Sequence, residues 1–486
     1  MPLVTIDNRI LSVPEGTLLS SLFSTHAHPC GGKGVCGKCK VRVWGEVSPL
    51  SAVEQRHLTS AEIADGIRLS CQTIVLGDCG VETLGDAALT VLTAGEGQPL
   101  SLYPGFTHYG AAADIGTTTL AARLYAPDGT LLAEGGAPNP QMAFGGDVLT
   151  RVEASQKGQA SGITAAVRTG LSSLLADLSA TAGIIPDKVE EVVITGNTVM
   201  LTLLVGGDVT PFATAPFTGY DRFGYTVTGA HVGLSDCPDA TVYLSPCASA
   251  FVGGDTATAL LATTLPDNGM LVDIGTNGEM VLKVVDTLYA CSTAAGPAFE
   301  GVGVSCGMVA APGAIDRVEL ANGTLHPHVI GGGKATGVCG SGLMDALACL
   351  ALLGDPTGPV SLAPGVILTA EDVQALLVSK SAIRSGIETL LYTAGMKAEN
   401  LTGLWIAGGF GSYLNISNAR RVGLLPSVPT YVVGNAALDG AAHLLLDTRL
   451  RGTLAAQTAA LQTVDLAQNP YFAKQFIENM TLEVPQ

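Results

Sequence analysis

A short motif, Asp-Ile-Gly-Thr, occurs twice in this chain, and its repetition constrains the fold more than any other feature. The copies begin at Asp114 and Asp273, 159 residues apart. Each copy follows an apolar run and precedes two more apolar runs joined by a turn, the pattern of a strand followed by a hairpin. Self-similarity at a long fixed spacing indicates a duplicated structural unit. We therefore predict two related lobes.

The chemistry of the repeated turn fits phosphate binding. An acidic side chain at the end of a strand can hold Mg²⁺ or one of its waters, and a following Gly-Thr turn offers N–H and hydroxyl donors to phosphoryl oxygens. Two such turns facing each other would clamp a nucleotide between the lobes. The candidate residues are Asp114, Gly116, Thr117, Thr118 and Thr119 in the first turn, and Asp273, Gly275, Thr276 and Asn277 in the second.

Further glycine-rich segments agree with a two-lobed nucleotide site. Residues 192–197 and 404–411 each read as a strand that ends in a glycine turn, one in each half of the repeat. Gly-Gly-Asp255 begins a helix shortly before the second motif. Helix N-termini favour anions, although glycines at helix starts are also common packing devices. Anion binding and close packing therefore both stay open as the role of the glycines at this helix start.

Together, these segments resemble the superfamily of acetate and sugar kinases, heat-shock chaperones and actin over about residues 110–486. The resemblance implies an α/β actin-like ATPase, with lobe 1 at about 111–265 and lobe 2 at about 266–486. It implies that Asp114 and Asp273 lie with the threonines and Asn277 around Mg²⁺ and the phosphates of ATP. Asp255 is a candidate for positioning water. Adenosine would lie near Gly408, Gly409 and Gly411.

A second motif, near the N-terminus, is a set of cysteines with ligand spacing. Cys30, Cys36, Cys39 and Cys71 follow the pattern C-x5-C-x2-C-x31-C. Three thiols on one glycine-rich loop and a fourth from a distant strand are the usual way to hold a 2Fe-2S cluster. Zinc sites favour two close cysteine pairs, which this spacing does not provide. Cys79 is an alternative fourth ligand, although the Ser-Cys71-Gln-Thr context favours Cys71.

The order of elements around these cysteines is that of a β-grasp ferredoxin, and the ligand segments resemble those of 2Fe-2S ferredoxins. We predict an α+β domain at residues 1–88 and a linker at 89–110, because the latter stretch is rich in glycine and proline and has no clear period. The expected elements are strands at 3–7, 9–13, 40–47, 67–74 and 80–84, and helices from Thr17 to about Ala27 and at 52–58.

Composition excludes several classes of function. The 486 residues carry a net charge of −18, which argues against a nucleic-acid binder, since that function needs a basic face. We see neither a signal peptide nor an apolar run long enough to cross a membrane. Eleven cysteines without a secretory signal favour metal ligation in a reducing compartment over disulfides. We therefore expect a cytoplasmic protein without a membrane partner.

An N-terminal 2Fe-2S domain, a linker and a duplicated ATPase together resemble the corrinoid activation proteins. The resemblance spans essentially the whole chain and includes Asp-Ile-Gly-Thr-Asn-Gly-Glu279, Ala-Gly-Pro-Ala-Phe-Glu300-Gly and Gly-Gly-Phe-Gly411. It implies an ATP-hydrolysing reductase that passes an electron from an external low-potential donor to the Co(II) corrinoid protein of a methyltransferase system, restoring Co(I). It also implies a homodimer. Larger relatives have an additional middle domain, for which the stretch between Leu84 and Ala111 is too short.

Three alternatives remain. An activator ATPase of a radical dehydratase would use a similar fold, but we expect such a protein to hold a 4Fe-4S cluster across a dimer. A small-molecule kinase with a redox regulatory domain would phosphorylate its substrate in stoichiometry with ATP loss. A redox-gated binding module would hold nucleotide without turnover. The first two would be enzymes and the third would not.

Overall fold

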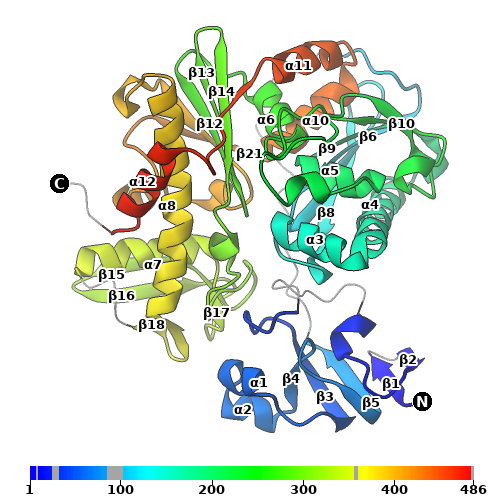
Figure 1. Cartoon of the computed structure of the whole chain (residues 1–486), viewed down its shortest axis with the longest axis vertical. Helices are drawn as coiled ribbons and strands as arrows, with labels where there is room; N and C mark the ends of the chain where they lie inside the picture. The colour runs from blue at the N-terminus through cyan, green and yellow to red at the C-terminus, as the bar shows by residue number, and fades with distance from the viewer. Residues whose placement is uncertain (7–8, 24–31, 85–101, 355–358, 483–486) are drawn as a thin grey trace.

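The computed structural model describes residues 1–6, 9–23, 32–84, 102–354 and 359–482. Cys30 lies outside the described residues, as does the expected linker as far as residue 101. Figure 1 shows a small N-terminal domain beneath two larger lobes that stand side by side.

The N-terminal domain is a five-stranded sheet in the order β2-β1-β5-β3-β4, in which only β1 and β5 are parallel. This is the expected β-grasp arrangement. Its core is made of alternate strand residues, among them Val4, Val41 and Val81, because side chains along a strand point to opposite faces. The elements are β1 (Leu3–Ile6), β2 (Arg9–Ser12), β3 (Lys40–Val47), α1 (Ala52–His57), α2 (Ser60–Ala64), β4 (Ile67–Leu69) and β5 (Val75–Thr83).

The expected helix from Thr17 is wrong over the residues that the structure describes. Only a single 3-10 turn forms, at Leu19–Leu22. The backbone N–H groups of Leu19 and Ser20 donate to Thr73 and Ser70 instead of closing an α-helix. The expected strand at 67–74 also ends early, at Leu69, because residues 70–74 turn to present Cys71. Tertiary pairing has overridden local propensity at both places.

The two lobes are built on sheets of matching topology, which confirms the duplication. The first sheet has the order β10-β11-β9-β6-β7-β8 and the second β21-β20-β12-β13-β14-β22. In each sheet, the strand that ends in Asp-Ile pairs in parallel with a strand on one side and begins an antiparallel hairpin on the other. The two Asp-Ile-Gly-Thr turns therefore occupy equivalent positions.

The first sheet is covered by long apolar helices, of which α4 buries Ile163, Val167 and Leu171 along one side. This spacing is that of one face of an α-helix. The elements of the first lobe are β6 (Tyr109–Ile115), β7 (Thr119–Tyr125), β8 (Leu131–Pro138), α3 (Val148–Ala154), α4 (Ala160–Ala182), β9 (Val189–Gly196), α5 (Thr198–Val205), β10 (Thr226–Thr228), β11 (Thr241–Leu244) and α6 (Gly254–Thr263).

The second sheet packs against α8, and a three-stranded sheet with α7 extends this lobe (Figure 1). Its elements are β12 (Gly269–Ile274), β13 (Gly278–Val284), β14 (Thr287–Thr293), β15 (Ala314–Ala321), β16 (Thr324–Val329), β17 (Gly337–Val338), α7 (Gly340–Leu353), β18 (Val360–Ala363), β19 (Val366–Leu368), α8 (Ala370–Thr393), β20 (Gly403–Ala407), α9 (Ile416–Arg421), β21 (Thr430–Gly434), α10 (Ala436–Leu446), α11 (Leu450–Ala459), β22 (Gln462–Thr463) and α12 (Pro470–Glu478).

Helix α10 returns from the second lobe to the first. It packs on β6 and β9, where Leu438, Leu444 and Leu445 join a core with residues of the first sheet. It also crosses α6 closely, because a Cβ on Gly440 would lie only 1.9 Å from the carbonyl oxygen of Thr258. Residues 266–486, which the sequence assigns to the second lobe, therefore contribute helix α10 to the first lobe as well.

The last part of the expected linker is packed on the first lobe. Phe106 is buried among residues of β6, β7 and α10. Tyr103 donates its N–H to the Leu446 carbonyl at 2.7 Å, and Thr107 donates its N–H to Glu190 at 2.6 Å. Residues 102–108 of the expected linker are thus anchored to the first lobe and to α10. Among the described residues, no helix is both long enough and apolar enough to cross a membrane.

Candidate functional site

The two Asp-Ile-Gly-Thr turns lie at the carboxyl ends of β6 and β12. Asp114 and Asp273 each precede the last residue of their strand, and the following glycine makes the turn into the hairpin. In the second turn, Gly275 donates its N–H to the Asn277 carbonyl at 2.9 Å. In the first, a Cβ on Gly116 would lie 2.9 Å from the Thr119 carbonyl oxygen, so the turn is tight.

Glu300 connects the two turns. Its carboxylate accepts a hydrogen bond from the Thr276 hydroxyl at 2.9 Å, and it also accepts one from the Thr118 hydroxyl. Thr118 belongs to the first turn and Thr276 to the second, so one side chain contacts both repeats. Burial raises the pKa of Glu300, although these hydroxyls and Arg151 oppose the shift. The structure therefore brings the two predicted phosphate turns together.

Asp114, Asp255, Asp273 and Glu279 gather at the same place. Burial, followed by repulsion from Asp255 and Asp273, raises the pKa of Asp114 to about 8. Burial also raises the pKa of Asp273 to about 7, with a further contribution from Asp255. Glu279 lies opposite Asp273 in the β12–β13 pair. Burial raises its pKa, and repulsion from Asp255 and Asp273 adds to the shift. Carboxyl groups that repel one another in this way favour the binding of a cation.

Asp255 lies in the first turn of α6, as the sequence predicts. Burial raises its pKa to about 6, although the N–H and hydroxyl of Thr256 partly oppose this. Among the described residues, no three His, Cys, Asp or Glu side chains converge to ligate a metal ion directly. Acidic side chains suit Mg²⁺, which usually binds beside nucleotides through one or two carboxylates together with water and phosphate oxygens.

The glycine segment after β20 closes against the second turn. Gly408 has a φ of +89°, and a Cβ there would lie 2.4 Å from an Asp273 carboxylate oxygen. Only glycine fits this position without moving Asp273. A Cβ on Gly409 meets nothing within 4 Å, whereas one on Gly411 would lie 2.7 Å from the Ile406 side chain. Gly408 and Gly411 therefore have packing roles in addition to the predicted proximity to adenosine.

A buried arginine supports the first turn. The Arg151 guanidinium, on α3, donates to the carbonyl oxygens of Thr117 and Gly145. Burial lowers its pKa to about 9, and the neighbouring Asp147 and Glu300 oppose that shift. Across the turn, Asn435 caps α10 and hydrogen-bonds to Asp114. These two side chains hold the backbone and the carboxylate of the first turn in place.

In the N-terminal domain, Cys36 and Cys39 lie on a glycine-rich loop, and Cys71 lies on the segment that follows β4. Cys39 and Cys71 pack in the same apolar cluster, and a Cβ on Gly32 would lie 3.9 Å from the Cβ of Cys71. Gly32, Gly34 and Gly37 all have positive φ, which lets the loop curl with its backbone close to the thiols. Thiols are the donors that an iron–sulfur cluster takes, so the residue types of Cys36, Cys39 and Cys71 suit such a cluster.

Cys79 is placed differently. It lies in β5 opposite Val4 and Gly45, and its side chain belongs to the apolar core of the sheet rather than to the group containing Cys39 and Cys71. Burial raises the pKa of the Cys79 thiol, and Asp78 adds to the effect. A raised pKa disfavours the thiolate that a metal requires.

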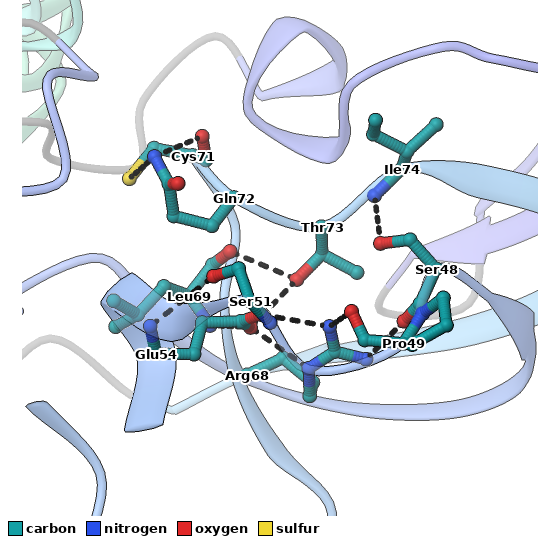
Figure 2. A network of polar contacts seen from close by, with 10 residues as sticks. All are labelled: Ser48, Pro49, Ser51, Glu54, Arg68, Leu69, Cys71, Gln72, Thr73 and Ile74. Carbon is teal, nitrogen blue, oxygen red and sulfur yellow. Dashed lines mark hydrogen bonds and ion pairs between the residues drawn. The ribbon is translucent and has the colours of Figure 1, made fainter. Parts of the chain in front are cut away.

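A network around Glu54 positions the segment with Cys71 (Figure 2). Glu54 has no exposed surface, and its two oxygens receive Nε and Nη2 of Arg68 at 2.8 and 2.9 Å. It also accepts hydrogen bonds from the N–H of Leu69 at 3.1 Å and the hydroxyl of Thr73 at 3.2 Å. Burial alone would raise the pKa of Glu54, but Arg68 and the backbone N–H donors outweigh it and hold the pKa below its usual range.

Sequence reasoning had not assigned roles to several of these residues. Glu54 has a recognisable signal, because Ser51-x-x-Glu54 is a helix capping box and both of its hydrogen bonds form. Glu279 and Glu300 belong to motifs shared with the corrinoid activation proteins, but their spacing does not indicate that they lie beside the two Asp-Ile-Gly-Thr turns. Arg151 and Asn435 have no local signal, since each reaches its partner across the fold.

The fold and the site together define a class of protein: a 2Fe-2S ferredoxin domain joined to a two-lobed actin-like ATPase. Three family models match in agreement with this. A 2Fe-2S iron–sulfur cluster binding domain matches residues 5–76, the RACo middle region matches 109–268, and the C-terminal ASKHA domain of RACo matches 267–355 and 356–485. The chain belongs to the RACo family of corrinoid activation proteins.

Individual relatives support this assignment. The chain is 32% identical over 415 residues to the corrinoid activation enzyme RamQ of Eubacterium limosum, covering 76% of this chain and 70% of that protein. It is 33% identical over 249 residues to the [Co(II) methylated amine-specific corrinoid protein] reductase of Methanosarcina barkeri, covering 44% and 45%. The solved structure of a reductive activator for a corrinoid, iron–sulfur protein superposes with a TM-score of 0.72 at 26% identity, covering 99% and 98%.

The family models divide the two-lobed region into a middle region and a C-terminal domain. The family's middle region matches residues 109–268, which form the first lobe. Because this region repeats the motif of the second lobe, the sequence assigns it to the ATPase and does not distinguish it as a separate region.

Proposed function

We propose that this protein is an ATP-dependent reductive activator that passes one electron to the Co(II) corrinoid protein of a methyltransferase system and so restores Co(I). The observation that carries the proposal is the joining of two phosphate turns, which meet at Glu300, to a cysteine loop that suits a one-electron carrier. The relatives named above are an activation enzyme and a reductase of corrinoid proteins, which supports the same substrate class here.

In the nucleotide site, Thr117, Thr118 and Thr276 would donate to the phosphates of ATP. Asp114 and Asp273 would hold the waters of Mg²⁺, and Asp255 would orient the water that attacks the γ-phosphate. The remaining contacts would come from Gly116, Thr119, Gly275 and Asn277 at the phosphates and from Gly408, Gly409 and Gly411 at adenosine. The convergence of four acidic side chains, all with pKa values raised by burial, supports a bound divalent cation.

In the N-terminal domain, Cys30, Cys36, Cys39 and Cys71 would be the cluster ligands. A 2Fe-2S cluster accepts and releases single electrons, which is the chemistry that this reaction needs. The protein holds the ligand segment still through Glu54 and Arg68 and packs Cys39 and Cys71 together away from bulk water. The Gln72 amide, 3.6 Å from the Cys71 sulfur, can donate to a thiolate there.

ATP can favour the reduction only by binding one conformation better than another. Glu300 offers the route, because it contacts the turn of each lobe and would sense a phosphate group placed between them. We propose that nucleotide binding or hydrolysis changes the relative position of the lobes, and that this alters cobalt coordination or docking in the bound corrinoid protein. The electron itself would come from an external low-potential donor.

The test is anaerobic mixing of the cluster-loaded protein with reductant, MgATP and a Co(II) corrinoid protein, followed by the Co(I) absorbance band. We expect Co(I) to form only when ATP is present. Asp273→Ala should abolish this without loss of the cluster absorbance. Absence of ATP-dependent Co(I) with every corrinoid partner tried would falsify the proposal. ATP loss matched by phosphorylation of a small molecule would favour the kinase alternative.

We further propose a cytoplasmic homodimer divided into residues 1–88, 89–110 and 111–486. The reducing compartment is supported by the abundance of cysteine, and the dimer by the resemblance to corrinoid activation proteins. Light scattering of the purified protein measures its mass and tests the dimer directly. A monomeric mass at micromolar concentration would contradict it.

A further inference from the structure

The loop that carries Cys36 and Cys39 touches the ATPase domain through a lysine. We call residues 32–39 the cluster loop. Lys38, half-buried at its end, donates hydrogen bonds to the carbonyl oxygens of Val304 at 3.0 Å and Gly307 at 2.7 Å. Both acceptors lie in the second lobe, in the segment that follows Glu300. Hydrogen bonds from an ammonium group are stronger than neutral ones, so this contact anchors the loop.

A second contact joins the cluster loop to the first lobe. Lys33 pairs with Glu153 of α3 at 2.8 Å, but the two side chains are 50% and 44% exposed. Ion pairs with this exposure contribute little to stability. Lys38 is therefore the principal anchor and Lys33 a supporting one. The N-terminal domain in Figure 1 lies below α3 and β17, in keeping with contacts to both lobes.

The segment whose carbonyl groups accept hydrogen bonds from Lys38 begins at Glu300, the residue that contacts both phosphate turns. Glu300 receives the hydroxyls of Thr118 and Thr276, and Val304 and Gly307 follow it by four and seven residues. The cluster loop and the nucleotide site are thus joined by one short stretch of chain, residues 300–307.

Residues 300–307 form a closely packed loop. A Cβ on Gly307 would lie 2.4 Å from the Gly301 carbonyl oxygen, so the two ends of the loop are in backbone contact. Ser305 donates its N–H and its hydroxyl to the two oxygens of Asp372, each at 2.5 Å. A closely packed loop of this kind shifts as a unit, because packed interiors are not continuously deformable.

Phosphate would compete with Glu300. The Thr118 and Thr276 hydroxyls that donate to this carboxylate are the same groups that the proposed function assigns to the phosphates. A nucleotide would take these donors and would repel the Glu300 carboxylate by its own negative charge. Nucleotide binding therefore favours a different position of Glu300, and with it of the carbonyl groups that hold Lys38.

We propose that Lys38 is a positioning residue that docks the cluster loop on the ATPase domain in the nucleotide-free state, and that nucleotide at the phosphate turns weakens this docking through residues 300–307. The inference rests on the proposed function, since it takes the turns to be the nucleotide site. Coupling between two binding events is reciprocal. Removing the Lys38 contact must then increase the affinity for nucleotide, although Lys38 does not touch the nucleotide site.

The experiment compares the full-length, cluster-loaded protein with its Lys38→Gln variant under anaerobic conditions. Lys40→Gln is the matched control, because Lys40 is also next to a cysteine ligand but pairs with Glu62 within its own domain. The probe is a non-hydrolysable ATP analogue with Mg²⁺. Its dissociation constant is measured by titration calorimetry, the radius of gyration by X-ray scattering, and cluster integrity by visible absorbance.

We expect Lys38→Gln to bind the analogue about fivefold or more tightly than wild type, in the usual range of coupling between sites. Its radius of gyration without nucleotide should match the larger value that wild type reaches with the analogue, while Lys40→Gln behaves as wild type. Unchanged affinity and radius in Lys38→Gln would overturn the docking inference alone. If wild type does not bind the analogue at all, the proposed nucleotide site fails and the inference fails with it.

Discussion

Arg68 and Glu54 form a two-point ion pair inside the ferredoxin domain, with Nε 2.8 Å from one carboxylate oxygen and Nη2 2.9 Å from the other. Glu54 is completely buried, and only 11% of the Arg68 side chain is exposed. Arg68 lies three residues before Cys71, so the pair holds the ligand segment as well as the fold. Removing one partner of a buried pair leaves an uncompensated charge, which typically costs about 3–5 kcal/mol.

We therefore expect Glu54→Gln to unfold or loosen the N-terminal domain, because small domains have only about 5–15 kcal/mol of stability. The iron content per chain and the visible absorbance should fall together. Glu62→Gln is a matched control, since Glu62 also closes a capping box but is 30% exposed. Its cost should be about 1 kcal/mol, the usual value of a cap. Equal cluster loss in both variants would contradict a special role for Glu54.

The fourth cluster ligand can be tested by two single substitutions. Cys71→Ser should remove or strongly alter the cluster absorbance, because Cys71 packs beside Cys39 at the cluster loop. Cys79→Ser should keep the spectrum, because Cys79 packs in the sheet core opposite Val4. Absorbance and electron paramagnetic resonance of the reduced proteins measure both. A spectrum kept in the first variant and lost in the second would transfer the ligand role to Cys79.

Arg123 of β7 and Asp439 of α10 meet at 2.7 Å, with 9% and 6% of their side chains exposed. Burial raises the pKa of Asp439 even though Arg123 and His443 oppose the shift. Replacing a buried ion pair by apolar residues of similar volume is often neutral or stabilising, because both charges lose their hydration on burial.

Asp439→Leu alone should lower the free energy of unfolding by about 1–3 kcal/mol, because buried Arg123 loses its shorter ion pair and keeps the longer one, to Glu134 at 3.3 Å. The double variant Arg123→Met/Asp439→Leu should recover most of this loss. Urea denaturation of wild type, Arg123→Met, Asp439→Leu and the double variant gives the coupling between the sites. A double variant as unstable as the sum of the two single variants would show that the sites are not coupled, which contradicts the prediction. Glu399→Ala, in an exposed pair with Lys397, should change stability by less than about 0.5 kcal/mol.

The anchoring of residues 107–108 should depend on pH. The N–H of Thr107, assisted by the His108 ring, lowers the pKa of Glu190 to about 2. Because the folded pKa lies below the ordinary glutamate value of about 4.3, the stabilisation is complete above that value and is lost as the pH falls toward 2. Its size is small, since 37% of the side chain is exposed.

The urea midpoint of Glu190→Gln should accordingly lie below that of wild type at pH 6, and the two should converge as the pH falls from about 4.3 to about 2. Glu399→Gln serves as the control, because Glu399 is 74% exposed and belongs to an isolated surface pair. A difference between wild type and Glu190→Gln that persists at pH 2.5 would rule out the ionised carboxylate as its source.

Local patterns in the sequence predicted the parts of this molecule that repeat or that follow a fixed spacing. Asp114 and Asp273 could be found because both turns follow the same strand and precede the same hairpin. The cysteine loop could be found from its spacing and glycines. These signals are short in range, and the two turns lie at equivalent positions of the two sheets.

Contacts between distant segments could not be predicted in the same way. The helix expected from Thr17 does not form over the described residues, because the N–H groups of Leu19 and Ser20 donate to carbonyl groups of residues 70–73, about fifty positions further along the chain. Glu300 reaches Thr118 from a separate loop, and Lys38 reaches Val304 across a domain boundary. Nothing in the residue types of these groups distinguishes them from ordinary surface charges. Their roles follow only from the packing of the two lobes.

Gly408 and Gly409 are neighbours in sequence and opposite in constraint. Gly408→Ala places a Cβ 2.4 Å from Asp273 and 2.6 Å from the Ile274 carbonyl oxygen, at a φ of +89°. Overpacking of this kind costs about 1–3 kcal/mol, and the left-handed backbone adds about 1–2 kcal/mol for a residue other than glycine. The substitution also pushes on the carboxylate that we assign to Mg²⁺, so it should weaken both stability and MgATP binding.

Gly409→Ala separates the two effects, because its Cβ meets no protein atom within 4 Å. The urea midpoint of this variant should equal that of wild type. If its affinity for MgATP nevertheless falls, the added methyl group must contact the nucleotide, which is the position near adenosine that the glycine segment predicts. Unchanged affinity in Gly409→Ala, together with loss of affinity in Gly408→Ala, would instead confine this segment to supporting Asp273.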